Sequence, residues 1–347
     1  MLPPLAEVRD VHRFDEAALA RWLAEHVEGF RGPLTVRQFR GGQSNPTYHL
    51  AAGGREYVLR RKPPGKLLPS AHAVDREYRV ITALGTTGYP VPKTYGFCED
   101  PDVIGTIFYV MECVHGRVIT DPQVPGLTPR ERAAIYDSLN ETLARLHTVD
   151  FQKLGLADFG RAGSYFARQI HRWTQQYRAS ETETIEAMER LIEWLPAHLP
   201  ADDETTLVHG DFRLGNTIIH PTEPRVVAVL DWELATLGHP LADLAYTCLP
   251  YRFARDWEGL AGRDLGALGI PTEPEYLAAY CRRTGRTAIP DWEFCLAFSM
   301  FRLSAIAQGI MGRVRAGTAN DPNARARGAR ARPLAEQAWA LLAARAG

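Results

Sequence analysis

The chain has 347 residues, of which 45% are hydrophobic and 23% are charged. This length and composition are ordinary for a folded protein with a sizeable core, and they suggest two domains or lobes. The formal net charge of −1 excludes a general electrostatic attraction to nucleic acid or to an acidic membrane surface. We therefore expect neither a nucleic-acid partner nor a membrane partner.

The cysteines and the apolar segments indicate a cytoplasmic protein. The five cysteines are scattered, with no CxxC motif and no spacing with histidines that would indicate a metal site, so we expect reduced, mostly buried thiols. The N-terminal residues mix acids, Arg and His before any apolar run, which is not typical of a secretory signal. The apolar stretch 294–310 contains Arg302 and Gln308, and we expect a core helix there. The oligomeric state stays open.

The first third of the chain is predicted to be a sheet with one helix. Strands are expected at 34–39, 47–50, 56–60 and 107–111. Apolar residues recur at helical spacing over 72–84, which predicts a helix between the third and fourth of these strands.

The turn between the first two strands, 41–45, has the sequence Gly-Gly-Gln-Ser-Asn. Glycine lets the backbone approach a phosphate closely, and Ser44 and Asn45 add hydrogen-bond donors. The turn is not a Walker A motif, because no Gly-Lys-Ser/Thr follows, and taken alone it predicts only a hairpin turn. Together with the acidic motif described below, it predicts a phosphate-covering loop with Gly42, Ser44 and Asn45 at the nucleotide.

The third predicted strand ends in three cations, Arg60, Arg61 and Lys62. Successive side chains of a strand point to opposite faces, so Val58, Arg60 and Lys62 share one face and Arg61 lies on the other. Arg60 is the predicted phosphate-binding cation. Lys62 stays an alternative because a guanidinium reaches further out than an ammonium. Arg61 is explained equally well as the solvated end of the strand.

Beyond residue 116 the chain is predicted to be mainly helical. Thr128-Pro129-Arg130-Glu131 forms a capping box with proline at the first helical position. Apolar residues then follow helical spacing from 135 to 146. The segment 312–332 is rich in Gly, Ala, Asn and Arg and is predicted to be a mobile loop. Further helices are expected at 164–179, 184–195, 240–248, 274–284, 291–311 and 333–345.

The residues at 207–216, Leu-Val-His-Gly-Asp-Phe-Arg-Leu-Gly-Asn, are followed by an apolar strand that ends in Asp231. An aspartate, an asparagine five residues later and a second aspartate after a strand are the minimal set for phosphoryl transfer. Asp211 would accept the proton of an attacking hydroxyl, while Asn216 and Asp231 would hold Mg²⁺ against the phosphates. Two neighbours have open roles: Glu233 would contact a second metal ion or form a structural hydrogen bond, and Arg213 would touch the γ-phosphate or form a salt bridge.

With these motifs the chain resembles the aminoglycoside phosphotransferase family, which shares the protein-kinase fold. It is most similar to the branch of kinase-like domains associated with acyl-CoA dehydrogenases. The resemblance extends from about residue 39 to about residue 246. It implies a bilobal α+β, protein-kinase-like fold with a small β-rich N-lobe at 1–112 and a larger helical C-lobe at 113–347.

The resemblance also implies roles for residues at the nucleotide. Val58 would pack on the adenine, and Glu77 would hold Arg60, which replaces the usual lysine. Met111, Glu112 and Cys113 would form the hinge, whose backbone groups recognise the base. ATP is the implied nucleotide, with GTP not excluded, and Mg²⁺ is the implied metal.

Only about ten residues separate Asp231 from the helix in which Asp243 lies. By the resemblance, Asp243 would accept hydrogen bonds from the catalytic-loop backbone. This short connection leaves no room for a peptide-docking platform, so the expected acceptor is a hydroxyl of a small molecule.

The arginines of the C-terminal region favour a phosphate- or carboxylate-bearing acceptor over a polycationic aminoglycoside. Together with the resemblance to the dehydrogenase-associated branch, they favour a hydroxyacyl-CoA or a similar anionic metabolite. A solvated loop explains the same composition. Three functions therefore stay open: a phosphotransferase acting on a small metabolite, an aminoglycoside kinase, and a nucleotide-binding pseudokinase or regulatory module. The arginines concerned are Arg302, Arg313, Arg315, Arg325, Arg327, Arg330 and Arg332.

Overall fold

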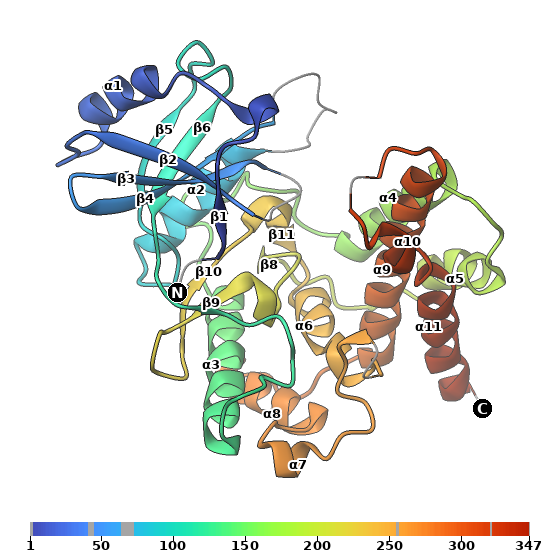
Figure 1. Ribbon diagram of the computed structural model, residues 1–347. Coiled ribbons are helices and arrows are strands. Elements are labelled where there is room, and N and C mark those ends of the chain that lie inside the picture. The colour runs from blue at the N-terminus through green and yellow to red at the C-terminus, as the bar shows by residue number, and fades with distance from the viewer. Residues whose placement is uncertain (1–2, 41–44, 64–72, 255–256, 320, 347) are drawn as a thin grey trace.

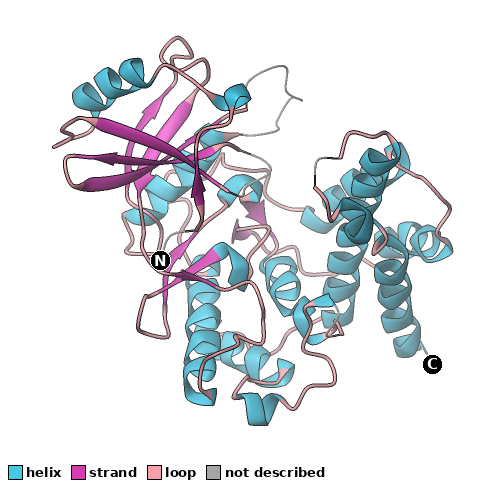
Figure 2. Cartoon of the chain, viewed as in Figure 1, coloured by secondary structure: helices cyan, strands magenta, loops and turns pink. Residues whose placement is uncertain are grey.

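The computed structural model describes residues 3–40, 45–63, 73–254, 257–319 and 321–346 (Figure 1). An antiparallel sheet dominates the N-terminal part of the chain, and helices make up most of the remainder (Figure 2). This is the predicted α+β architecture, with a smaller β-rich lobe and a larger helical lobe. The predicted loop residues Gly42 and Ser44 lie outside the described residues.

The six strands of the N-lobe sheet follow the order β1-β2-β3-β4-β6-β5, and every neighbouring pair is antiparallel. The register places Val58 opposite His49 on one side and Met111 on the other. It places Arg60 opposite Thr47 and Tyr109. The bounds are β1 (Leu5–Ala6), β2 (Leu34–Phe39), β3 (Thr47–Ala52), β4 (Arg55–Arg61), β5 (Thr94–Cys98) and β6 (Phe108–Glu112).

Helix α1 (Glu16–His26), which the sequence reasoning did not predict, covers one face of this sheet. Its buried residues Leu19, Trp22 and Leu23 belong to a small core that also contains Leu59 of β4. The side chain of Asp15 caps the helix by accepting a hydrogen bond from the Ala18 amide. The opposite face of β4, which carries Val58 and Arg60, is therefore directed toward the rest of the protein.

Arg61 is not a solvated strand end, which corrects one reading of the sequence. It is only 2% exposed. Its guanidinium donates to the Tyr48 hydroxyl at 3.1 Å, to the Ile104 carbonyl at 2.9 Å and to the His12 carbonyl at 2.9 Å. A buried cation is tolerated when its donors are satisfied, so Arg61 supports the sheet from the side facing α1.

Helix α2 (Val74–Gly85) packs beside β5, β6 and the 232–234 turn of the C-lobe. The C-lobe begins with β7 (Arg117–Val118) and α3 (Pro129–His147). The predicted capping box is confirmed: the Thr128 hydroxyl accepts from the Glu131 amide, and the Glu131 carboxylate accepts from the Thr128 amide.

Five short strands of the C-lobe form two small sheets, β10-β9-β7 and β11-β8. They are antiparallel throughout and hold the segments that carry the acidic motif. The remaining strands are β8 (Thr206–Val208), β9 (Thr217–Ile219), β10 (Val226–Val229) and β11 (Thr236–Gly238). The remaining helices are α4 (Tyr165–Ala179), α5 (Glu186–Ala197), α6 (Pro240–Cys248), α7 (Leu265–Leu268), α8 (Glu273–Thr284), α9 (Trp292–Arg315), α10 (Ala324–Gly328) and α11 (Ala331–Ala346).

Helix α9 is the central helix of the C-lobe and packs against α4, α6, α10 and α11. Among the described residues it is the one helix long and apolar enough to cross a membrane, but 72% of its most apolar window is buried inside the protein. Helix α9 is therefore mostly buried, as predicted for a core helix at 294–310.

The segment 312–332 is not one loop, which is a second correction. Helix α9 continues to Arg315, α10 spans Ala324–Gly328, and α11 begins at Ala331. Helix α10 packs on α9, with Gly328 against Met311. This tertiary contact outweighs the loop-like local composition.

Candidate active site

Asp243 of α6 holds the loop after β8 in place through hydrogen bonds to its backbone. The two carboxylate oxygens of Asp243 accept hydrogen bonds from the backbone amides of His209 at 2.6 Å and Gly210 at 2.8 Å. This confirms the predicted contact. Burial would raise the pKa of Asp243, but the hydrogen bond and charge of His147, together with His209, lower it below its ordinary value.

Gly210 is required at its position in this loop. Its φ of +82° lies in the left-handed region, which glycine adopts without a steric penalty. A Cβ atom would also lie 2.7 Å from the carbonyl oxygen of Leu234. The glycine thus lets the loop pass close to the turn after Asp231, which brings the two acidic segments together.

Asp211 and Asn216 are in direct contact. The Asn216 side-chain nitrogen donates to the Asp211 carboxylate at 2.8 Å and to the Asp211 carbonyl at 2.9 Å. The second carboxylate oxygen, Oδ1, is buried, and Nε of Arg213 lies 3.4 Å from it. The Tyr246 hydroxyl lies close enough to the same carboxylate to donate a hydrogen bond to it. A carboxylate that an amide orients and a neighbouring hydroxyl can reach is suited to accept a hydrogen bond from the hydroxyl of a bound molecule.

Asp231 follows β10 and has a left-handed backbone, with φ 67° and ψ 55°. For a residue with a Cβ atom this conformation costs on the order of 1 kcal/mol, and such strain concentrates at functional sites. The Asp231 carboxylate lies 2.7 Å from Nη2 of Arg60, so the C-lobe acid meets the N-lobe cation.

Arg60 forms the predicted pair with Glu77 of α2. Its Nε lies 2.8 Å from Oε2 of Glu77. Burial opposes the charge of Arg60, but Glu77, Tyr109 and Asp231 together raise its pKa, so the guanidinium stays charged. Lys62 lies 3.9 Å from the exposed Asp75. Within the described residues, the structure thus favours Arg60 over Lys62 as the cation inside the site.

Glu77 is 1% exposed and accepts two further hydrogen bonds. These come from the Asn45 side chain at 2.9 Å and from the Tyr109 hydroxyl at 3.0 Å. Asn45, predicted as a donor to phosphate, therefore donates to Glu77 in this structure. Burial raises the pKa of Glu77 to about 7, against the opposing effect of Arg60.

The raised pKa of Glu77 predicts that the free energy of unfolding depends on pH. A folded-state pKa of about 7 against an ordinary 4.5 means that the folded protein binds the proton more tightly than the unfolded chain. The stability of the wild type relative to Glu77→Gln should be greatest below pH 4.5 and should decline, by up to about 3 kcal/mol, as the pH rises through 7. Urea unfolding of both proteins at pH 5 and pH 8 measures this. A difference that does not vary with pH would contradict the assignment.

A pocket of about 280 Å³ lies between the lobes, next to Arg60 and Asp231, and both residues line it. The predicted residues Val58, Met111, Glu112 and Cys113 line it too. Burial, with the carboxylates of Glu56 and Glu112, raises the pKa of the Cys113 thiol to about 12, so the thiol is protonated at neutral pH when no metal ion is bound to it.

Sequence reasoning missed the floor of this pocket. Ile218 of β9 and Val118 of β7, which are register partners, line it together with Leu230. All three residues of β9 are buried, so no alternation along this strand marks Ile218 as a lining residue. Asn45, Glu77, Asp211 and Asn216 do not line this pocket. Glu77 pairs with Arg60 and accepts a hydrogen bond from Asn45, whereas Asp211 and Asn216 form the separate pair described above.

Comparison with known proteins places this geometry in a family. A family model described as the phosphotransferase enzyme family, APH, matches residues 35–298, well over half of the chain. The chain belongs to this phosphotransferase family. Mouse acyl-CoA dehydrogenase family member 10 is 50% identical over 342 residues, which cover 97% of this chain. The match covers 32% of the mouse protein, so the chain spans about a third of that relative's length.

Solved structures of the phosphotransferase family share this fold, which confirms the kinase-like architecture. The crystal structure of a candidate aminoglycoside phosphotransferase from Ralstonia eutropha JMP134 matches with a TM-score of 0.89 and 53% identity. That match covers 96% of this chain and 99% of the other. A thermostable mutant of aminoglycoside phosphotransferase APH(4)-Ia, in ternary complex with ADP and hygromycin B, matches with a TM-score of 0.59 at 16% identity. It covers 93% of this chain and 98% of that one.

Proposed function

We propose that this chain transfers the γ-phosphoryl group of ATP, with Mg²⁺, to a hydroxyl group of a small molecule. Membership of the phosphotransferase family supports small-molecule kinase activity. The observation that carries the finer proposal is the link between the catalytic loop and the segment that ends in Asp231. The Leu230 amide donates to the Asn216 backbone carbonyl at 2.8 Å, and the next residue, Asp231, meets Arg60 across the lobes.

The pocket between the lobes suits a nucleotide. Val58 and Met111 from the N-lobe and Ile218 and Leu230 from the C-lobe offer apolar surfaces for a purine ring. Arg60, at the same end as Asp231, would bind the α- and β-phosphates. The fold relative APH(4)-Ia was crystallised with ADP, which is consistent with ATP as the nucleotide.

The donor atoms near Arg60 suit Mg²⁺. Magnesium prefers oxygen ligands, and Asp231 offers carboxylate oxygens. The side-chain nitrogen of Asn216 donates to Asp211, which leaves the side-chain oxygen Oδ1 of Asn216 for a cation. When bound, the metal would neutralise charge on the phosphates. Asp231 and Asn216 are the residues that would hold it.

Asp211 would act as the base. The hydroxyl oxygen of the acceptor forms a bond to the γ-phosphorus while the bond from that phosphorus to the bridging oxygen of ADP breaks, and the hydroxyl proton passes to Asp211. Asn216 positions the carboxylate through its hydrogen bond. Asp243 holds the loop that carries it.

An anionic acceptor such as a hydroxyacyl-CoA is the finer part of the proposal, and Arg302 supports it. Arg302 of α9 is 8% exposed, and no carboxylate lies within salt-bridge distance of it among the described residues. Its guanidinium lies over the rings of Tyr246 at 5.2 Å and Trp173 at 5.5 Å. Burial raises the pKa of the Tyr246 hydroxyl, and the nearby carboxylate of Asp211 is the second cause. Arg302 therefore lies over a ring that is itself close to Asp211.

An unpaired buried cation is costly, and an anionic group of the substrate would offset that cost. Trp173 also lines a groove of about 600 Å³ between α4 and α9. Small apolar residues such as Ala305, Ile306 and Gly309 line the same groove, which suits the acyl part of such a substrate. By contrast, Arg327 and Arg332 of the C-terminal region pair with Asp321 and Glu183, so these two arginines are explained by surface ion pairs.

Arg302→Gln should raise the KM for an anionic acceptor by about 10- to 100-fold with little change in kcat, because a charge-assisted hydrogen bond contributes about 1.5–3 kcal/mol. The KM for a neutral sugar acceptor should not change. Steady-state kinetics with both acceptor types measure this, with the exposed Arg325→Gln as the matched control. An equal increase in KM for both acceptors would show that Arg302 does not recognise the anionic group of the acceptor.

ATP turnover on a panel of hydroxyacyl-CoAs, sugars and aminoglycosides tests the whole proposal. Turnover with the hydroxyacyl-CoAs supports the proposal. Turnover with aminoglycosides alone would show that the acceptor is an aminoglycoside and would overturn the hydroxyacyl-CoA assignment. Nucleotide binding without turnover on any member of the panel would support the regulatory reading and overturn the proposed activity.

A further inference from the structure

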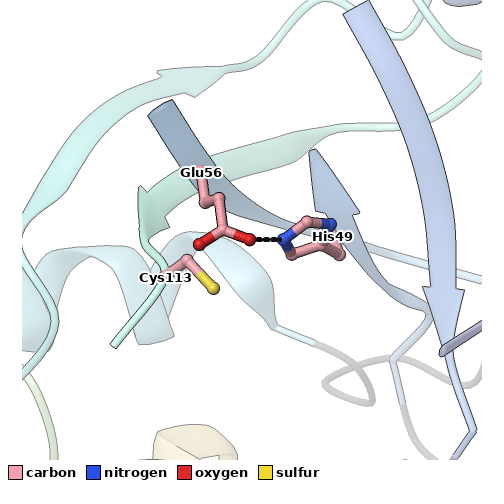
Figure 3. A group of neighbouring side chains, drawn as sticks. All are labelled: His49, Glu56 and Cys113. Carbon is pink, nitrogen blue, oxygen red and sulfur yellow. Dashed lines mark hydrogen bonds and ion pairs between the residues drawn. The ribbon is translucent and has the colours of Figure 1, made fainter. Parts of the chain in front are cut away.

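Three side chains of types that bind metals, His49, Glu56 and Cys113, lie close together at the hinge end of the N-lobe sheet, and His115 contacts Glu56. We call these four residues the hinge cluster. Figure 3 shows the first three. His49 is on β3 and Glu56 on β4, while Cys113 and His115 follow β6. The register pairs His49 with Val58, two residues from Glu56, so the imidazole and the carboxylate share one face of the sheet.

The ligand atoms of the hinge cluster are close together. Nε2 of His49 lies 2.7 Å from one carboxylate oxygen of Glu56, and Nε2 of His115 lies 2.6 Å from the other. Sγ of Cys113 and the ligand atoms of His49 and Glu56 all lie within 4.8 Å of one another. Bonds to zinc are about 2.0–2.3 Å long, so small side-chain movements would bring all three atoms onto one ion.

We propose that the hinge cluster binds a zinc ion, with His49, Glu56 and Cys113 as ligands and His115 as the fourth. A mixed set of nitrogen, oxygen and sulfur ligands is typical of zinc and is not suited to Mg²⁺ or Ca²⁺. The set therefore differs in kind from the oxygen ligands of Asn216 and Asp231. It is a second metal site, with ligands other than those proposed for Mg²⁺.

The burial of the four residues fits a partly preformed site with an entry path. His49 and Cys113 are buried, whereas the side chains of Glu56 and His115 are 38% and 50% exposed. An ion held by these residues would connect β3, β4 and the hinge. Because Cys113 also lines the nucleotide pocket, the ion would fix the hinge beside the base.

The contacts of Glu56 with His49 and His115 are also explained by ordinary ion pairs in a protein without zinc. In that interpretation Cys113 has no role. Cys113 therefore decides between the two interpretations. The test uses Co²⁺ as a spectroscopic substitute for Zn²⁺, because a Co²⁺–thiolate bond gives an intense charge-transfer absorption that oxygen and nitrogen ligands do not give. The full chain is used without a polyhistidine tag or nucleotide. Excess Mg²⁺ competes for the Asp231 site.

The wild type should bind one Co²⁺ with the thiolate absorption, and Zn²⁺ should displace it. Cys113→Ser should lose the absorption completely. His115→Gln, an exposed change that leaves the fold intact, should weaken Zn²⁺ binding by at least about tenfold. Cys281→Ser, in the partly exposed cysteine of α8, is the matched control and should behave as the wild type. Absence of the absorption in the wild type, or unchanged Zn²⁺ affinity in both Cys113→Ser and His115→Gln, would overturn the proposal.

Discussion

Asp211→Asn is expected to bind ATP with wild-type affinity and to lose most phosphoryl transfer, with kcat reduced by about 10²- to 10⁴-fold. An amide keeps the size of the carboxylate and still accepts the hydrogen bond from Asn216, which lies at 2.8 Å. It cannot take up the proton of the acceptor hydroxyl. Calorimetric titration of ATP and rapid-quench measurement of a single turnover separate binding from chemistry.

The matched control for this variant is Asp150→Asn, which changes an exposed aspartate after α3 that pairs only with the nearby Lys153 in the described structure. This control should retain full kcat. If Asp211→Asn transfers phosphate at the wild-type rate, Asp211 is not the base.

Asp231→Asn is expected to lower transfer by at least about a hundredfold through loss of the metal ligand charge. Asparagine tolerates the left-handed backbone at this position, so the variant should fold. The signature differs from that of Asp211→Asn, because ATP affinity itself should fall and should no longer increase when Mg²⁺ is added. Titrations of ATP with and without Mg²⁺ measure this.

Asp231→Ala provides a second variant that removes the side chain altogether. It should show the same loss of metal-dependent binding, with an added decrease in stability because alanine disfavours the left-handed conformation. Retained Mg²⁺-dependent binding in both variants would show that Asp231 does not hold the metal.

Much of the candidate site follows from short-range patterns. The contact of Asp211 with Asn216 spans five residues, and the capping box at Thr128 spans three, so local geometry determines both. The pair of Arg60 with Glu77 also forms as the family resemblance implies. Helix α1, which was not predicted, also has local signals, namely the capping side chain of Asp15 and the helical spacing of Leu19, Trp22 and Leu23.

Local composition failed where tertiary contacts compete with it. The residues of α10 have a loop-like composition, yet packing on α9 stabilises a helix there. Arg61 was assigned to solvent from its place at a strand end. Its three hydrogen-bond partners are the hydroxyl of Tyr48 on β3 and the carbonyls of Ile104 and His12, two segments distant in the sequence, which no local pattern reveals.

The sequence by itself determined the acidic motif, the family and the α+β class, because these depend on residues that are near neighbours or that recur with a fixed period. Only the tertiary structure placed Cys113 beside His49 and buried Arg302 over the ring of Tyr246, with no carboxylate partner in the part of the chain that the structure describes. The first depends on the register of strands that are distant in sequence. The second depends on how a core helix packs, and burial of a charge is a property of the whole fold rather than of its local sequence.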